Sequence, residues 1–71
     1  MRGNNINLIK SFIMGDKSLV SLVINGGARE AIDKAQEKTG VVLSKTQRNI
    51  LLSILEDSVA RDELNAEYLS F

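Results

Sequence analysis

Apolar residues recur along the chain at helical spacing, in segments separated by glycines. The first segment, from Asn5 to Met14, contains Ile6, Leu8, Ile9, Phe12 and Ile13. Residues 28–39 place small or apolar side chains on one face: Ala28, Ala31, Ile32 and Ala35. The strongest amphipathic pattern comes after Ser44 and consists of Ile50, Leu51, Ile54 and Leu55. These spacings predict three helices, the first with a wide apolar stripe.

Glycines and short polar residues mark where these helices should begin and end. Gly15 follows the first segment, at a position where glycine commonly adopts left-handed backbone. Asp16 is a candidate N-cap for the next segment. Ser44 and Gln47 have the spacing of a capping box, in which each side chain bonds to the other residue's backbone amide. Leu43, just before this box, could pack against the first turns of the helix that follows.

Residues 17–25 fit two secondary structures. Their apolar positions are Leu19, Val20, Leu22, Val23 and Ile24. The residue types are typical of a strand, whereas the spacing also fits a buried helical face. Gly26 and Gly27 end the segment in either case.

The glycine pair has three interpretations. It could join two helices, it could be a loop that binds phosphate between a strand and a helix, or it could be a peptidase site that follows the leader of a secreted peptide. Neither G-x-G-x-x-G nor the P-loop pattern is present. The chain also offers only one other short strand candidate, Val41–Leu43, as a partner in a sheet. A joint between helices is therefore favoured.

Length and composition narrow the range of functions. A chain of 71 residues forms one domain, predicted to span residues 1–71. It contains no cysteine and no histidine, which removes disulfides, thiolate metal sites and the commonest general base. We therefore identify no candidate catalytic, cofactor-binding or metal-ligating residue and expect no enzyme. No apolar run is long enough to cross a bilayer and no signal peptide is evident, so a cytoplasmic location is expected by elimination.

The charge balance bears on nucleic-acid binding. Nine basic and nine acidic residues give a formal net charge of zero, whereas nucleic-acid binders usually carry a basic excess. A helix-turn-helix nevertheless remains an alternative, with residues 35–40 ending its first helix and residues 44–54 forming its second. The second helix would then offer these polar side chains to a groove: Lys45, Gln47, Arg48 and Asn49.

The C-terminal segment carries a separate apolar pattern. Residues 57–65 are polar and predict a bend, after which Leu64, Tyr68, Leu69 and Phe71 could form a last short helix. Residues 60–71 could thus dock separately on the rest of the domain. Because this end holds two of the three aromatic residues, we predict that Tyr68, Leu69 and Phe71 bind a partner.

Several of these features together resemble a known family. The order is Leu8-x-x-x-Phe12, Asp16-x-x-Leu19, Ala31-Ile32-x-x-Ala35, and a step from Gly40 to Ser44. This pattern resembles the nif-type leader domain of ribosomally synthesised, post-translationally modified peptide precursors. The resemblance implies a helical domain that is read by a peptide-modifying enzyme. The chain departs from the family in that its double glycine lies inside the matched region and it has no cysteine for thioether chemistry.

Together these patterns predict an all-α fold, a small bundle of four to five short helices. Its predicted core consists of Leu8, Phe12, Leu19, Val23, Ile32, Ala35, Leu43, Ile50, Leu51 and Ile54. The favoured function is a non-enzymatic recognition module that binds a protein partner, either as a leader-type precursor or by self-association. A DNA-binding regulator is the first alternative and a secreted antibacterial peptide with a double-glycine leader is the second. No cofactor is expected.

Overall fold

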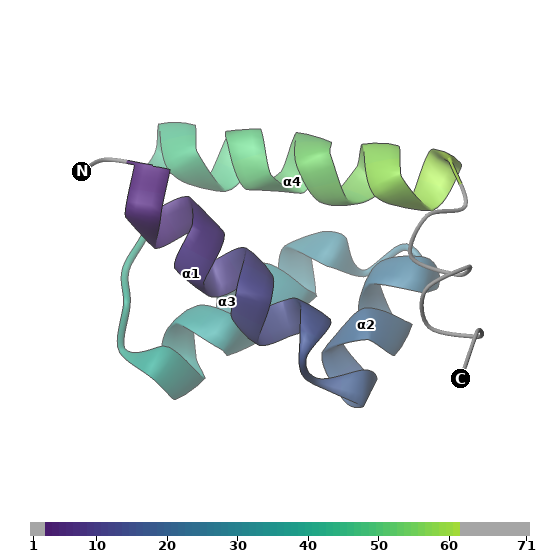
Figure 1. Ribbon diagram of the computed structural model, residues 1–71, viewed down its shortest axis with the longest axis horizontal. Helices are drawn as coiled ribbons and strands as arrows, with labels where there is room; N and C mark the ends of the chain where they lie inside the picture. Colours follow the sequence, from purple (N-terminus) through teal and green to yellow (C-terminus); the bar gives the residue numbers. More distant parts are fainter. Residues whose placement is uncertain (1–2, 62–71) are drawn as a thin grey trace.

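Four helices make up most of the chain that the computed structural model describes, which is residues 3–61. They are α1 (Gly3–Met14), α2 (Lys17–Ile24), α3 (Ala28–Thr39) and α4 (Lys45–Ala60). Each helix contacts the other three, and α4 runs along one side of the others (Figure 1). No strand occurs between residues 3 and 61, so the all-α prediction is confirmed for this part. The last helix predicted from sequence lies outside it.

Residues 17–24, whose sequence fits either a strand or a helix, form helix α2. In α2, Leu19, Val20 and Val23 are buried, which is the spacing of one helical face. The Asp16 side chain caps it by accepting hydrogen bonds from the backbone amides of Ser18, at 3.0 Å, and Leu19, at 3.3 Å. This confirms Asp16 as the N-cap and excludes the strand-based phosphate loop. Gly15 follows α1 as expected, but the prediction of left-handed backbone there is wrong, since Gly26 and Gly40 are the only described glycines with positive φ.

The glycine pair ends α2 in a Schellman arrangement. The amide of Gly27 donates to the carbonyl of Leu22 at 2.6 Å, and the amide of Gly26 donates to Val23 at 3.1 Å. Gly26 has a φ of 91°, which side chains disfavour. A Cβ on Gly27 would lie 3.1 Å from the Leu22 carbonyl oxygen. The positive φ at Gly26 and the close contact at Gly27 both favour glycine in the turn between α2 and α3, which confirms the joint predicted from sequence.

The connection from α3 to α4 is held by side chains on both sides. Gly40 ends α3 with a φ of 76°. The backbone amide of Leu43 then donates to Oε1 of Gln36 at 2.7 Å, which fixes the extended segment against α3 while Leu43 is buried. The capping box of Ser44 and Gln47 is present and starts α4, as predicted.

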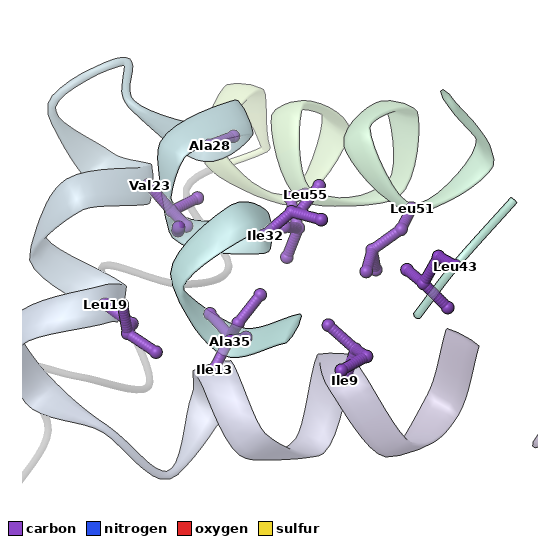
Figure 2. Close-up of a cluster of buried hydrophobic side chains, with 11 residues drawn as sticks. Ile9, Ile13, Leu19, Val23, Ala28, Ile32, Ala35, Leu43, Leu51 and Leu55 are labelled. Carbon is purple, nitrogen blue, oxygen red and sulfur yellow. The ribbon is translucent and has the colours of Figure 1, made fainter. Parts of the chain in front are cut away.

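The core is aliphatic throughout and draws on all four helices and the last connection (Figure 2). Its buried members are Ile9, Ile13, Leu19, Val20, Val23, Ala28, Ala31, Ile32, Ala35, Leu43, Leu51 and Leu55. Six of the ten predicted core residues are among them: Leu19, Val23, Ile32, Ala35, Leu43 and Leu51.

The other four predicted core residues are not fully buried, although Phe12 packs against the core cluster. Leu8 is 46% exposed and Ile50 is 45% exposed, while Phe12 and Ile54 are only partly buried. In each helix the buried positions are the next residues along, Ile9 and Ile13 in α1 and Leu51 and Leu55 in α4. A step of one residue rotates a helical face by about 100°. The wide apolar stripes of α1 and α4 are therefore turned so that the side with Ile9 and Ile13, or with Leu51 and Leu55, faces the core.

Candidate functional site

A groove lies between α3 and α4. Its volume is about 290 Å³. Helix α3 contributes Arg29, Ile32 and Asp33. Helix α4 contributes Lys45, Arg48, Asn49 and Leu52. All of these except Ile32 and Leu52 are classed as exposed, so the groove has a polar rim over an apolar floor.

The spacing of residues on the two helices explains why these side chains meet. Residues 29, 32 and 33 are three and four apart, and residues 45, 48, 49 and 52 repeat that spacing. Residues at these intervals share one side of a helix. The α4 set begins at the first helical residue after the Ser44 cap, so the capping box determines where the rim of the groove starts.

The floor of the groove is an extension of the hydrophobic core. Ile32 is only 2% exposed and belongs to the buried cluster, and Leu52 is partly buried and packs against that cluster. An apolar group that enters the groove would therefore contact a surface already held rigidly by the packed core.

The rim carries an excess of positive charge that the described chain does not neutralise. Arg29, Lys45 and Arg48 supply three cations and Asp33 supplies one carboxylate. Within residues 3–61, none of these four groups takes part in an ion pair or a side-chain hydrogen bond. Their charges are therefore available to a ligand.

The depression between α2 and α3 is the informative contrast. It too is lined by charged residues, among them Glu30, Lys34 and Lys38. There Lys34 lies 3.9 Å from a Glu30 carboxylate oxygen, and Lys38 lies 3.6 Å from Asp16. Because its lysines already pair with carboxylates of this chain, that depression offers less to an external anion than the groove between α3 and α4.

Asp16 owes its altered acidity to its capping role. The hydrogen bond from the Ser18 hydroxyl, 2.7 Å long, is the main cause that lowers the pKa of Asp16 below its ordinary value. The backbone amide of Leu19 is the next cause that lowers it, whereas burial acts in the opposite direction. The backbone amide of Ser18 and the charge of Lys38 lower the pKa by smaller amounts than burial raises it. Asp16 thus stabilises the start of α2 in its ionised form.

The predicted site residues fall into three groups. Tyr68, Leu69 and Phe71 lie outside the described residues. Lys45, Arg48 and Asn49, named as side chains that a helix-turn-helix would offer, lie together on the groove. Gln47, named with them, is used in the capping box instead.

Sequence analysis missed the half of the groove that belongs to α3. Neither Arg29 nor Asp33 is among the site residues predicted from the sequence. Their four-residue spacing, with Ile32 between them on the same side, was the available signal. This spacing indicates a site only when α4 is known to lie beside α3.

Within residues 5–61, three large aliphatic side chains are exposed outside the groove. Val42 is 80% exposed, and Leu8 and Ile50 are each nearly half exposed. Each is the neighbour in sequence of a core residue, and those neighbours, Ile9, Leu43 and Leu51, gather at one end of the core (Figure 2). Some aliphatic exposure was expected from composition, and these side chains show where it occurs.

Comparisons with known proteins identify no relative. The chain matches no protein-family model, and no curated protein or solved structure is significantly similar to it. None of the helices between residues 3 and 61 combines the length and the apolar character that a membrane crossing requires. In the same range, no three acidic, histidine or cysteine side chains come together in a way that could hold a metal ion.

Proposed function

We propose that this chain is a non-enzymatic recognition module, a small helical bundle that binds a protein partner in the groove between α3 and α4. One observation carries the proposal: a rim of cations that have no ion-pair partner within residues 3–61 stands over an apolar floor that continues the core. A site of this composition can bind a polypeptide through both its charges and its apolar side chains. The described lining of the groove holds a single carboxylate and the sequence has no histidine or cysteine, so the site lacks the commonest catalytic nucleophiles and bases.

A leader-type role is the specific form of this function that the sequence pattern favours. In that role the partner would be a peptide-modifying enzyme that reads the helical domain and acts on the residues after it. The proposal is supported by the sequence resemblance and by the helical segments at the matching positions. Mass spectrometry of the chain from its native host would test it, because a modified or shortened C-terminal segment is expected.

The recognition proposal can be tested by cross-linking from the groove. A photoreactive phenylalanine analogue replaces exposed Asn49 in the groove, and in a control chain it replaces exposed Lys17 on α2. After irradiation in the native host, we expect a polypeptide adduct from position 49, identified by mass spectrometry, and its loss when Arg48→Glu is added. Identical adducts from both positions, or no polypeptide adduct from position 49, would contradict the proposal.

DNA binding is the second candidate, and one observation favours it. Lys45, Arg48 and Asn49 lie on one side of the first turns of α4, where a recognition helix would contact bases. A gel-shift assay distinguishes the two functions. The recognition proposal predicts no shift of random duplex at moderate salt. A sequence-dependent shift that is lost in Arg48→Ala and Asn49→Ala would establish the regulator instead.

The secreted-peptide interpretation is not the one we propose. A cut after Gly27 would separate α2 from α3, which pack against each other, and would leave Ala28, which is 3% exposed in the folded chain, at a new end. Recovery from the host of a peptide that begins at Ala28 would revive this interpretation.

A further inference from the structure

We infer that the occupant of the groove between α3 and α4 is an acidic peptide segment that carries one large apolar side chain. The inference rests on the proposed function and specifies the chemistry of its partner. It follows from three properties of the groove as residues 3–61 form it: the sign of the charge on its rim, the apolar nature of its floor, and the position of Asp33 among its cations.

The sign of the charge selects an anionic partner. Arg29, Lys45 and Arg48 outnumber Asp33 by two charges in the groove, although the whole chain has a formal net charge of zero. The excess is therefore local to this surface. Exposed charges of this kind contribute little affinity singly, but together they steer and align an oppositely charged segment.

The floor requires an apolar group in addition to the anion. Ile32 is buried, whereas Leu52 is only partly covered by the described chain. A partner side chain such as leucine or phenylalanine would cover the remaining apolar surface of Leu52. The groove has a volume of about 290 Å³, which is just below the range of about 300–1,000 Å³ that is typical of ligand pockets. It is thus suited to one anchoring side chain with its flanking residues.

Asp33 makes the groove selective among anions. A nucleic-acid backbone presents closely spaced phosphates along its whole length, and one of them would come near this carboxylate. A peptide can instead place a backbone amide there, because Asp33 has acceptor oxygens without a partner in residues 3–61. Repulsion of this kind adds specificity beyond what attraction supplies. This property favours an acidic peptide over DNA or RNA.

Fluorescence anisotropy with the full-length chain tests the inference. The probe is a fluorescein-labelled decapeptide with four glutamates around one phenylalanine in an alanine and serine background. A second probe has glutamine in place of every glutamate, and a third has serine in place of phenylalanine. We expect the first probe to bind at least about tenfold more tightly than either of the others, with affinity that falls as salt rises.

A matched pair of variants controls for general charge effects. Lys45→Glu changes the groove, and Lys17→Glu makes the same change away from it. Both lysines are exposed and each is the first residue of a helix, directly after its N-cap, so the effect on the helix dipole is the same in both. We expect Lys45→Glu to weaken binding of the first probe by at least about fivefold and Lys17→Glu by less than about twofold. Circular dichroism confirms that both variants are folded.

Three outcomes would overturn the inference. They are equal weakening by the two variants, equal binding of the glutamine probe, and displacement of the first probe by an equimolar amount of random duplex DNA. If the probe does not bind but position 49 still cross-links to a polypeptide, the recognition function stands and only the acidic chemistry of its partner is wrong.

Discussion

Truncation of Leu51 and of its neighbour Ile50 provides the sharpest test of how α4 packs. Leu51 is fully buried, whereas Ile50 is 45% exposed. Both side chains are aliphatic with the same number of carbons, and both lie well inside α4. Leu51→Ala and Ile50→Ala therefore remove equal amounts of side chain from adjacent positions, and any difference in stability reports which side of the helix faces the core.

The expected free energies follow from burial. Removal of three carbons at about 0.8 kcal/mol each costs about 2.4 kcal/mol at a fully buried site, and the cavity left behind raises this to about 3–4 kcal/mol. At the half-exposed site the transfer cost is about 1.3 kcal/mol. The site is open to solvent and so leaves no closed cavity, and the better helix propensity of alanine returns a few tenths of a kcal/mol. We expect Ile50→Ala to cost about 1 kcal/mol or less.

Urea denaturation followed by the far-ultraviolet circular dichroism of the helices measures both changes. A domain of this size is expected to be stable by about 4–10 kcal/mol. With a slope of about 1 kcal/mol/M for a small chain, Leu51→Ala should lower the midpoint by about 3 M and Ile50→Ala by about 1 M or less. If Leu51→Ala leaves no folded baseline, Ile9→Val removes one carbon from another fully buried side chain and should cost about 0.5–1.5 kcal/mol.

The comparison is open to a clear refutation. Equal midpoints for Leu51→Ala and Ile50→Ala would mean that both side chains are equally buried, and a larger loss for Ile50→Ala would mean that the helix faces the core through its other edge. In either case the assignment of Leu51 and Leu55 to the core would be wrong. Leu8→Ala is an independent control in α1, since Leu8 is 46% exposed and should behave like Ile50→Ala.

Three further predictions concern helix ends and turns. Ser44→Ala removes the side-chain half of the capping box and should lower the free energy of unfolding by about 1 kcal/mol in the same urea assay, whereas no change would show that the box is not needed. Gly40→Ala should destabilise the fold by about 1 kcal/mol, because a φ of 76° strains any side chain even though nothing lies within 4 Å of the added Cβ. Gly15 has no positive φ, and its added Cβ would lie 3.4 Å from the nearest atom, so Gly15→Ala should be neutral or stabilising. The pKa of Asp16 is lower in the folded chain than in the unfolded one, so its contribution to stability is present above the unfolded pKa and is lost as pH falls through the folded pKa. Across this acidic range, the urea midpoint of Asp16→Asn should therefore fall less steeply with falling pH than that of the unmutated chain. An unchanged slope would contradict the role of the ionised cap.

Local hydrogen bonding and periodicity made much of the fold predictable from sequence. Asp16 caps α2, and Ser44 and Gln47 start α4, because each cap bonds to amides two or three residues away and needs no distant partner. The glycine pair was predictable for the same reason, since its bonds return to the helix that it ends. The range 28–39 was assigned correctly because small apolar and charged residues separate cleanly onto two faces.

The identity of the buried edge was not a local property. In α1 and in α4, adjacent large aliphatic residues compete for the core, and sequence gives Leu8 and Ile9, or Ile50 and Leu51, similar apolar character. Only the positions of the other helices decide which is covered. The secondary structure of residues 17–25 was likewise not a local property. Their residue types are typical of strands, but they form helix α2, whose apolar face is buried against the other three helices.

The groove shows this division most clearly. The sequence by itself determined each helical face of the site, with Arg29 and Asp33 on one and Lys45, Arg48 and Asn49 on the other. Tertiary structure alone decided that these faces meet. The Leu43 amide donates a hydrogen bond to the Gln36 side chain, and the Leu43 side chain lies in the core. These two contacts hold the connection to α4 against α3, so that α4 packs next to Ile32. The spacing of residues within a helix follows from its 3.6-residue turn, whereas the distance between two helices depends on how every side chain between them packs.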